Sequence, residues 1–428
     1  MKPKIFMLIA GEASGDLLAA ELVSALLAVS KRSEDGRVPQ FFGAGGPRMA
    51  AAGVELAFDL TRHSVIGISD VLKNYFKFRR LFNQLLALAI ERKPDVVIGV
   101  DYGGFNLRFG HAVKEYTREN PFANWNPKII QFVSPQVWAS RPGRAHLLAA
   151  DYDLLLSIFP FEKDWYAKRV PKLRVEFVGH PMVERFNSEG RVPRAPIPEN
   201  SGARRARLSE ILLLPGSRAD ELRRHLPPML GALKLIREKI PTIKAEMVLP
   251  NERLLDQLIW LLAEQTGTAI RSTRPITGPL ANKLANDLAK KFLPDFEIQI
   301  GNLPQALAQA DVAIASTGTV TMECAFFGVP TVTLYKTSWL TYQIAKRIVK
   351  VKWLTMPNIL ADEEIYPEFV QDAATSEHIA GTALELLQNE PRRVQIKKRL
   401  AQVVSSLGGP GATARAATAI SSLFEPPR

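Results

Sequence analysis

Residues 4–27 read KIFMLIAGEASGDLLAAELVSALL, a strand pattern that runs directly into a helix pattern. The uninterrupted apolar run Ile5–Ile9 is typical of a buried parallel strand, and Leu17–Leu27 has the apolar spacing of a helix. Between them lies the loop Gly11–Asp16. Such a loop suits an anion, because backbone N–H groups and the positive end of the helix dipole point at it. The loop also carries two carboxylates, so a phosphate cradle, a sugar-binding loop and plain packing all remain open.

The same alternation of short apolar runs and longer helical patterns fills both halves of the chain. Strands are expected at Ile5–Ile9, Val96–Val100, Ile129–Val133, Leu154–Ile158 and Val175–Val178, and again at Ile211–Leu214, Ala245–Leu249, Glu297–Ile300, Val312–Ala315 and Thr331–Leu334. This pattern predicts an α/β protein with two doubly wound, Rossmann-like domains facing a central cleft. The expected divisions are 1–186, a Pro- and Arg-rich linker at 187–209, a second domain at 210–390, and C-terminal helices at 391–428 that pack back on the first domain.

The composition is that of an ordinary soluble globular protein, with 46% hydrophobic and 23% charged residues among 428. The single cysteine, Cys324, allows no intrachain disulfide, which favours a reducing cytoplasm. Glu12 interrupts the first apolar run, so we expect neither a signal peptide nor a membrane span. A net charge of +12 favours anionic partners. The bases are spread out and no nucleic-acid-binding signature is present, so nucleic acid is not expected.

One acidic residue of the first half stands where open α/β sheets bind ligands. In DVVIGVDYGGFN, Asp101 follows a strand directly, with Gly103-Gly104 and Asn106 after it. A carboxylate there can accept a proton from a substrate hydroxyl. The alternative is that Asp101 caps the following helix.

Two loops of the second half have the composition of a nucleotide-sugar site. Gly216, Ser217 and Arg218 follow a strand, and this set suits a diphosphate. A second strand leads into Ser316, Thr317, Gly318 and Thr319, and Glu323 lies one turn into the next helix. We expect phosphate at the helix tip and ribose hydroxyls on the glutamate. In the alternative, Thr319 caps the helix and Glu323 is solvated.

Other polar features receive less weight. Asp151-Tyr152-Asp153 has the spacing of a metal-binding motif but precedes its strand, so no metal site is expected there. His180 follows a strand near the linker, although a lone histidine is more often structural. No P-loop, complete G-x-G-x-x-G or G-x-S-x-G motif supports an NTPase, a dinucleotide oxidoreductase or a serine hydrolase.

Taken together, the segments resemble the lipid-A-disaccharide synthase family, inverting glycosyltransferases of the two-domain GT-B architecture. The resemblance is carried by GEASGD, FGAGGPRM, VIGISDVL, KPDVVIGVDYGGFN, FVSPQVWASRPGR, FPFEKDWY, VEFVGHPM, LLPGSR, ASTGTVTMECAFFGVPTV, MPNILADEEIYPEFVQ and LGGPGATARAA. These segments run in the family's order from near the first residue to about residue 417.

The resemblance implies transfer of 2,3-diacylglucosamine from UDP-2,3-diacylglucosamine to 2,3-diacylglucosamine 1-phosphate, with release of UDP and no cofactor or metal. Asp101 would be the base, and the two loops of the second half would hold UDP. The acceptor would contact Glu12, Ser14, Gly15, Asn106 and His180. The family works at the cytoplasmic face of the inner membrane, so an anionic membrane surface is an expected partner. A homodimer is left open.

The chain also departs from the family's pattern. Gly103-Gly104 replaces a frequent Pro-Asp pair, Ser140 replaces a frequent tryptophan, and Ala361-Asp362-Glu363-Glu364 replaces Ala-Gly-Arg-Glu. Two other readings remain, a different GT-B-like UDP-sugar enzyme such as a 2-epimerase, and a UDP-sugar or lipid-binding protein without catalysis. Intact Asp101 and Glu323 argue against the second.

Two segments combine apolar and basic residues. Ser64–Ile90 places Lys77, Arg79 and Arg80 among many apolar residues, with no acid between Asp70 and Glu91. Such a basic amphipathic helix suits the surface of an anionic bilayer, although helical apolar spacing is more often core. Trp339–Trp353 is a second, weaker candidate.

Overall fold

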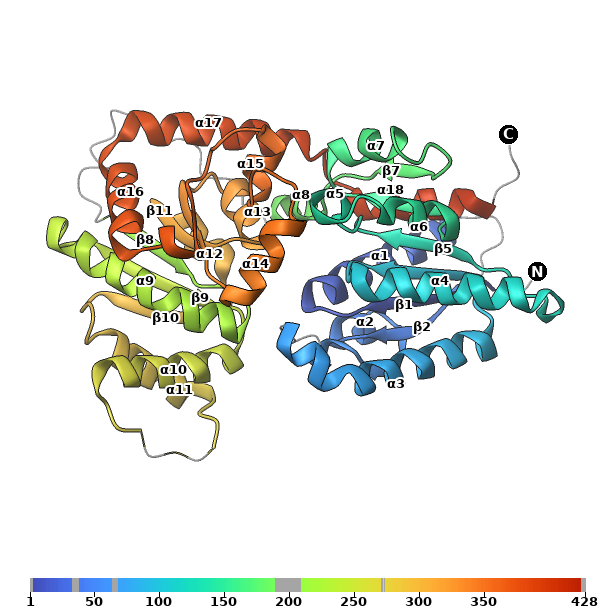
Figure 1. Cartoon of the computed structure of the whole chain (residues 1–428), viewed down its shortest axis with the longest axis horizontal. Coiled ribbons are helices and arrows are strands. Elements are labelled where there is room, and N and C mark those ends of the chain that lie inside the picture. Colours follow the sequence, from blue (N-terminus) through green and yellow to red (C-terminus); the bar gives the residue numbers. More distant parts are fainter. Residues whose placement is uncertain are drawn as a thin grey trace. The chain divides into compact units, whose positions relative to one another are not determined.

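A computed structural model describes residues 3–32, 38–63, 68–188, 209–270, 272 and 274–424 (Figure 1). The chain forms two compact units. Unit 1 comprises Met1–Arg185, Ile348–Lys350 and Leu407–Arg428, and unit 2 comprises Phe186–Arg347 and Val351–Ser406. Most of the expected linker lies outside the described residues. The C-terminal boundary differs from the expected one, because helix α17 belongs to unit 2 and only the chain from Leu407 onward belongs to unit 1.

Unit 1 is built on a parallel sheet with the strand order β3-β2-β1-β4-β5-β6-β7. The strands are β1 (Ile5–Ala10), β2 (Gln40–Gly45), β3 (Glu55–Asp59), β4 (Val96–Val100), β5 (Lys128–Phe132), β6 (Leu154–Ser157) and β7 (Val175–Phe177). Every residue of β4 is buried, as expected for a central strand covered on both faces. Strands β2 and β3 were not predicted, because two glycines interrupt the apolar run in β2 and charged residues begin and end β3.

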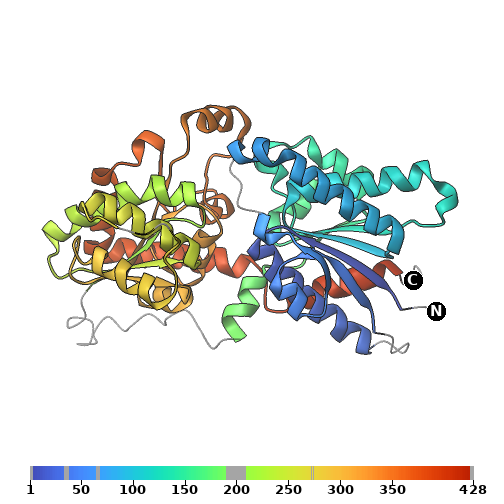
Figure 2. The same cartoon turned by 90° about the horizontal axis from the view of Figure 1, so that it is seen from below.

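Helices cover both faces of this sheet. They are α1 (Ala13–Arg32), α2 (Pro47–Ala51), α3 (Ile68–Arg92), α4 (Gly103–Glu119), α5 (Val137–Ser140), α6 (Arg144–Asp151), α7 (Pro160–Ala167), α8 (Pro181–Ser188) and α18 (Ala412–Ser421). Figure 2 shows α3 and α4 on one face and α1 with α18 on the other. This arrangement follows from right-handed crossovers on either side of β1.

Helix α1 satisfies the length and composition of a membrane span. Within the part of the chain that the structure describes, Ala13–Lys31 is the one such helix. Leu22 and Val23 on this helix are buried, and the helix packs against β1 and α18 inside unit 1. Part of its apolar surface therefore belongs to the core of unit 1.

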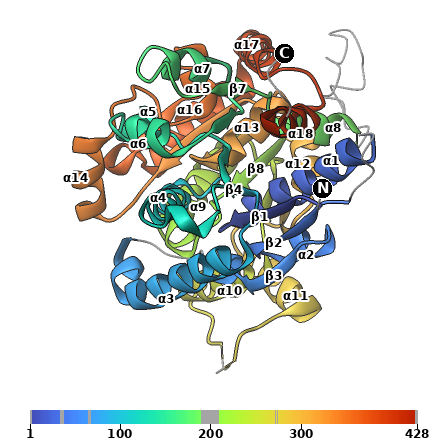
Figure 3. The ribbon, with the colours of Figure 1, turned by 90° about the vertical axis from the view of Figure 1, so that its right-hand side faces the viewer.

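The C-terminal segment is bound to unit 1 through two of the motifs that carry the family resemblance. His180 donates its backbone N–H to the carbonyl of Leu407 at 2.9 Å, and the Arg415 guanidinium donates to the carbonyl of Val178 at 2.8 Å. Helix α18 then lies beside α1 (Figure 3). The VGHP and LGGPG segments thus hold the last helix, α18, against unit 1.

Unit 2 repeats the architecture with the order β10-β9-β8-β11-β12-β13, again parallel. Its strands are β8 (Glu210–Leu214), β9 (Lys244–Leu249), β10 (Phe296–Ile300), β11 (Val312–Ser316), β12 (Thr331–Tyr335) and β13 (Glu368–Val370). Its helices are α9 (Ala219–Lys239), α10 (Glu252–Thr266), α11 (Gly278–Ala289), α12 (Leu303–Gln309), α13 (Thr319–Phe326), α14 (Trp339–Ile348), α15 (Met356–Ala361), α16 (Ser376–Gln388) and α17 (Glu390–Ser406). Helix α14 extends by one residue beyond the boundary at Arg347.

A buried carboxyl group joins two other motif segments in unit 1. Glu162 on α7 accepts a hydrogen bond from the indole N–H of Trp138 at 2.9 Å, and its second oxygen lies 2.6 Å from the Ser157 hydroxyl. That hydroxyl also lies 2.7 Å from the carbonyl of Phe159. Since Ser157 has one proton for two acceptors, both contacts are satisfied when Glu162 is protonated and donates to Ser157. Burial raises the pKa of Glu162 to about 7, in agreement with this arrangement.

We predict that Glu162 makes the stability of the protein fall as the pH rises. Its folded-state pKa lies above the usual 4.5, so its stabilising contribution is complete below about pH 4.5 and is lost as the pH passes 7. The loss amounts to about 3 kcal/mol in the free energy of unfolding. Urea unfolding at pH 5 and pH 8 should show a fall that is smaller in Glu162→Gln than in the parent. The exposed Glu115→Gln in the same unit is the control, and an equal fall in Glu162→Gln and the parent would contradict the assignment.

Candidate functional site

Each sheet has one point where the strand order reverses, and the predicted site residues other than His180 lie at or near these two points. In unit 1 the reversal lies between β1 and β4, whose carboxyl ends lead into Gly11–Gly15 and Asp101. In unit 2 it lies between β8 and β11, which lead into Pro215–Arg218 and Ser316–Thr319. Open α/β sheets bind ligands at such switch points. The two units therefore each present one candidate site.

The two loops of unit 1 are packed tightly against each other. The Tyr102 ring lies so close to Gly11 that a Cβ at that position would be 2.3 Å from its Cδ1 atom. A Cβ at Gly15 would lie 3.3 Å from the Val100 carbonyl and 3.7 Å from Asp101 Cβ. Glycine at position 11 is thus required by the approach of the tyrosine. The GEASGD loop and Asp101 form one site.

Asp101 has an unusual backbone conformation that two buried side-chain amides hold in place. Asp101 and Tyr102 adopt left-handed backbone angles, with φ of 50° and 47°. The Asp101 carbonyl accepts from the Asn106 amide at 2.8 Å and from the Gln131 amide at 2.9 Å. The Asp101 N–H donates to the Phe132 carbonyl at 2.8 Å. The backbone that carries the carboxylate is therefore fixed on both sides.

These contacts change the role expected for Asn106. It was predicted to bind the acceptor, but only 2% of it is exposed and its amide supports the Asp101 loop. Gln131 was not identified from the sequence. Its signal was a glutamine inside the otherwise apolar strand KIIQF, where a polar residue requires a buried hydrogen-bond partner.

The Asp101 carboxyl group is in an environment that suits proton transfer. Burial raises its pKa, while a hydrogen bond from the Tyr102 backbone lowers it by less. A raised carboxyl pKa brings the group closer to the working pH, where a base is most efficient. The capping alternative receives no support, because the N-cap position of α4 falls on Tyr102.

The GEASGD loop contains one structural carboxylate and one at the site. Asp16 is 2% exposed and accepts from the backbone N–H groups of Gly46, Arg48 and Met49 at 2.8–3.0 Å. It caps the start of α2, which ties GEASGD to the FGAGGPRM segment. Glu12 is partly exposed, and its charge raises the pKa of Tyr102 after the larger effect of burial. Ser14 is exposed and Gly15 is buried beside Asp101.

In unit 2, the loop after β8 is ordered by a glutamate. Gly216 adopts φ of 122°, and the Ser217 N–H donates to Glu221 at 2.9 Å. Arg218 is exposed and lies 3.5 Å from the other Glu221 oxygen. Ser217 and Arg218 are thus accessible at the start of α9.

The loop after β11 leads to an open helix start. Gly318 occupies the N-cap position of α13 with φ of 140°, and no side chain caps it. The alternative in which Thr319 caps the helix is therefore wrong. Gly318 and Thr319 are exposed, and Thr317 and Glu323 are partly buried. Ser316, which was predicted to bind the donor, is the last residue of β11 and is only 1% exposed. Contacts between this loop and a ligand are therefore expected from Thr317–Thr319.

A buried histidine that the sequence did not reveal joins these loops to the next strand. The His225 Nδ1–H donates to the Pro215 carbonyl at 2.8 Å, and its Nε2 accepts from the Lys336 N–H at 2.9 Å. Burial lowers the pKa of His225 and keeps it neutral, as this tautomer requires. The sequence gave no sign of this role for His225, because the histidine lies on the apolar face of α9.

His180 lies away from the β1/β4 switch point. It follows β7 at the edge of the sheet, with β5 and β6 between that strand and β4. Its Nδ1 accepts from the Met182 N–H at 3.2 Å, and burial lowers the pKa of His180 to about 3. Its backbone N–H binds the C-terminal segment, and its place at the edge of the sheet gives no support to the acceptor contact expected for it.

Both aspartates of the D-x-D motif, Asp151 and Asp153, form ion pairs with basic side chains. Asp151 pairs with His111 at 2.8 Å and Arg118 at 3.0 Å. Asp153 pairs with Lys114 and Lys128. Across the described ranges, no group of three or more His, Cys, Asp or Glu residues has the arrangement of a metal site.

The departures from the family's pattern have local explanations. A Cβ at Gly103 would lie 2.6 Å from Pro135, so the residue must be small here. Asp362 takes the left-handed conformation at the C-cap of α15, a position that favours glycine. Glu363 pairs with Arg399 on α17. These changes are accommodated within their own units.

Two doubly wound parallel α/β units in one chain define the GT-B class of architecture. Solved structures support this class: a UDP-GlcNAc 2-epimerase from Neisseria meningitidis bound to UDP-GlcNAc has a TM-score of 0.55 at 11% identity, covering 99% of this chain and 100% of its own. MurG from Acinetobacter baumannii has a TM-score of 0.51 at 16% identity, covering 98% and 100%.

Sequence comparison gives the particular family. The family described as lipid-A-disaccharide synthetase matches residues 5–273 and 276–422. The lipid-A-disaccharide synthase of Trichlorobacter lovleyi is 34% identical over 429 residues, covering 99% of this chain and 98% of the relative. The chain belongs to the lipid-A-disaccharide synthase family, and it is a hexosyltransferase of lipid A biosynthesis.

Proposed function

We propose that this protein joins UDP-2,3-diacylglucosamine and 2,3-diacylglucosamine 1-phosphate into the β-1,6-linked disaccharide 1-phosphate and releases UDP. The observation that carries the proposal is Asp101, held at the switch point of unit 1 with a raised pKa in a chain of this family. Unit 1 takes the acceptor in this proposal, and unit 2 takes the donor.

Asp101 acts as the general base. Its carboxylate removes the proton of the acceptor's 6-hydroxyl while that oxygen forms a bond to the anomeric carbon of the donor. The bond from this carbon to the UDP oxygen breaks, and UDP leaves with the electron pair. A single displacement inverts the anomeric centre. Glu12 and Ser14, on the loop that adjoins Asp101, are placed to hydrogen-bond sugar hydroxyls.

Unit 2 stabilises the departing UDP in this account. The exposed start of α13 at Gly318 and Thr319 directs backbone N–H groups and the helix dipole outward, which favours a diphosphate. Arg218 adds a positive charge at the neighbouring loop. Glu323 accepts hydrogen bonds from the ribose hydroxyls in this proposal. These groups supply charge stabilisation without a metal ion.

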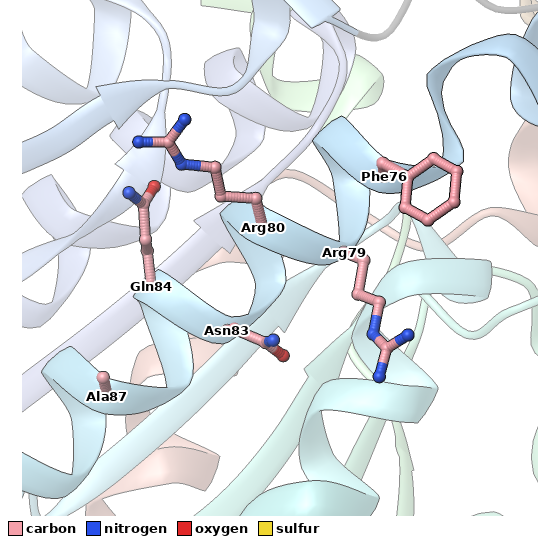
Figure 4. A pocket seen from close by; sticks show the side chains of 6 residues that line it. All are labelled: Phe76, Arg79, Arg80, Asn83, Gln84 and Ala87. Atoms are coloured by element: carbon pink, nitrogen blue, oxygen red, sulfur yellow. The ribbon is translucent and has the colours of Figure 1, made fainter.

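Membrane association rests on two helices with exposed apolar and basic residues. Phe76 on α3 is 79% exposed, and Lys77, Arg79 and Arg80 beside it are exposed. Figure 4 shows an open hollow on α3 that is lined by Phe76, Arg79, Arg80, Asn83, Gln84 and Ala87. Phe82 and Leu85 on the same helix pack on the core, so only part of the apolar surface of α3 is available. Residues 64–67 of the predicted segment lie outside the described residues.

The second helix is α14, which has no buried residue. Trp339 and Leu340 are 72% and 64% exposed, and Lys346 and Arg347 lie in its last turn. We propose that α3, with α14 as the weaker contributor, binds the protein to the cytoplasmic face of an anionic membrane.

Replacing Asp101 by asparagine should lower turnover by about 10²-fold or more, because the base is lost while the shape is kept. Release of UDP from the donor, measured with and without acceptor, gives the rate. UDP affinity should be unchanged, and the exposed Asp164→Asn is the control for turnover. Near-parental turnover in folded Asp101→Asn would remove Asp101 as the base.

Arg218→Ala and Glu323→Gln should each weaken UDP binding by about 1–3 kcal/mol, because each removes a charged hydrogen bond. Calorimetry with UDP measures this. Arg223→Ala is the matched control, since Arg223 lies on the same helix and pairs with Asp220. Unchanged affinity in both variants would place the nucleotide elsewhere.

Changing Lys77, Arg79 and Arg80 together to glutamate should abolish flotation with anionic vesicles, because each base near the surface contributes about 1 kcal/mol. The parent's binding should weaken as salt is added. Changing Lys239, Lys283 and Lys290 to glutamate alters the net charge equally and should have no effect. Flotation of the α3 variant at the parent's level would show that this helix is not the anchor.

A further inference from the structure

Three arginines of unit 1 form a group that the proposed chemistry does not yet use. Arg108 lies in the second turn of α4, Arg141 directly follows α5, and Arg144 is the first residue of α6. Helices α4 and α6 pack together, with the Tyr152 hydroxyl after α6 donating to the Asn106 carbonyl at 2.7 Å. Arg108 and Arg141 are exposed, and Arg144 is partly buried. We call these three side chains the arginine cluster.

The arginine cluster concentrates positive charge on one part of unit 1. Partial burial, and then the charges of Arg141 and Arg108, lower the pKa of Arg144, so both neighbouring guanidinium groups act on that of Arg144. None of the three makes an ion pair among the described residues. Farther along α4, by contrast, His111, Lys114 and Arg118 are all paired with Asp151 or Asp153. Like charges brought together without an acid are unfavourable unless an anion binds between them.

The cluster lies at the same edge of the sheet as Asp101. Helix α4 begins two residues after Asp101, and Arg108 is five residues farther, about 7–8 Å along the helix axis. Helical side chains lean toward the N-terminus, which directs this long side chain back toward the edge. Arg141 and Arg144 lie in the segment that follows β5, the strand next to β4.

We infer that Arg108, Arg141 and Arg144 bind the phosphate of the acceptor sugar phosphate. The inference rests on the proposed function, in which the acceptor has a 6-hydroxyl at one end and a 1-phosphate several bonds away across the ring. When the hydroxyl lies at Asp101, the phosphate must be set back from that carboxylate. The arginine cluster supplies planar, bidentate donors at such a position. The GEASGD loop, which adjoins Asp101 itself, is then left for sugar hydroxyls.

The test compares two acceptors, 2,3-diacylglucosamine 1-phosphate and the same sugar without its phosphate, in neutral detergent so that no anionic lipid is present. The measured quantity is the ratio of kcat/KM for the phosphorylated acceptor to that for the other. The parent should strongly prefer the phosphorylated acceptor. Arg108→Ala, Arg141→Ala and Arg144→Ala should each lower the ratio about tenfold or more.

Arg253→Ala, an exposed arginine on α10, is the control and should keep the parent's ratio. Arg144→Lys, which keeps the charge but loses the bidentate geometry, should give an intermediate ratio and guards against a folding defect in Arg144→Ala. If the parent turns over and all variants keep its ratio, the inference is wrong while the proposed function stands. If the variants keep the ratio but no longer float with anionic vesicles, the cluster binds lipid headgroups; the inference is then also wrong while the proposed function stands. If the parent turns over neither acceptor, the proposed function itself fails.

Discussion

The structure of the candidate site depends on one buried contact, the pair of amides that hold the Asp101 carbonyl. Two consecutive non-glycine residues in left-handed conformation cost of the order of 1–3 kcal/mol each. Hydrogen bonds from Asn106 and Gln131 to one carbonyl offset this cost inside the protein, where an unsatisfied carbonyl would be expensive. The contact joins β4, α4 and β5. It places the carboxylate beside Gly15, lets the Tyr102 ring lie over Gly11, and starts α4 so that Arg108 follows at the same edge.

Much of the fold could be predicted from residue patterns, and the exceptions have physical reasons. Strands such as β4 and β11 are covered on both faces, and a continuous apolar run is the direct consequence. Strands β2, β3 and β13 were not predicted, because glycines interrupt β2 and a charged residue begins both β3 and β13. The loops after β1, β4, β8 and β11 were identified because ligand loops follow strands. Two of these loops meet at each switch point. This pairing could be recognised only from the strand order, which no single segment of the sequence reveals.

The individual roles within the site were harder to predict than its location. Asn106, Ser316 and His180 are polar residues near strand ends, the position expected of ligands. Asn106 and Ser316 are nevertheless buried, and His180 is partly buried at the edge of the sheet. Gln131 and His225 were missed because they hydrogen-bond to backbone groups distant in sequence. Several segments that carry the family resemblance are structural for the same reason. In MPNILADEEIYPE, the fully buried Asn358 bonds the backbone of Ile365 and Tyr366, while Glu368 accepts from Leu354 and Thr355.

The central claim is that this chain makes a glycosidic bond between two acylated glucosamines. Mass spectrometry of the products after incubation with UDP-2,3-diacylglucosamine and 2,3-diacylglucosamine 1-phosphate tests it most directly. The account predicts the disaccharide 1-phosphate with a β-1,6 linkage, formed in equal amount with UDP. Release of UDP with free 2,3-diacylglucosamine, or an altered UDP-sugar with no disaccharide, would contradict it.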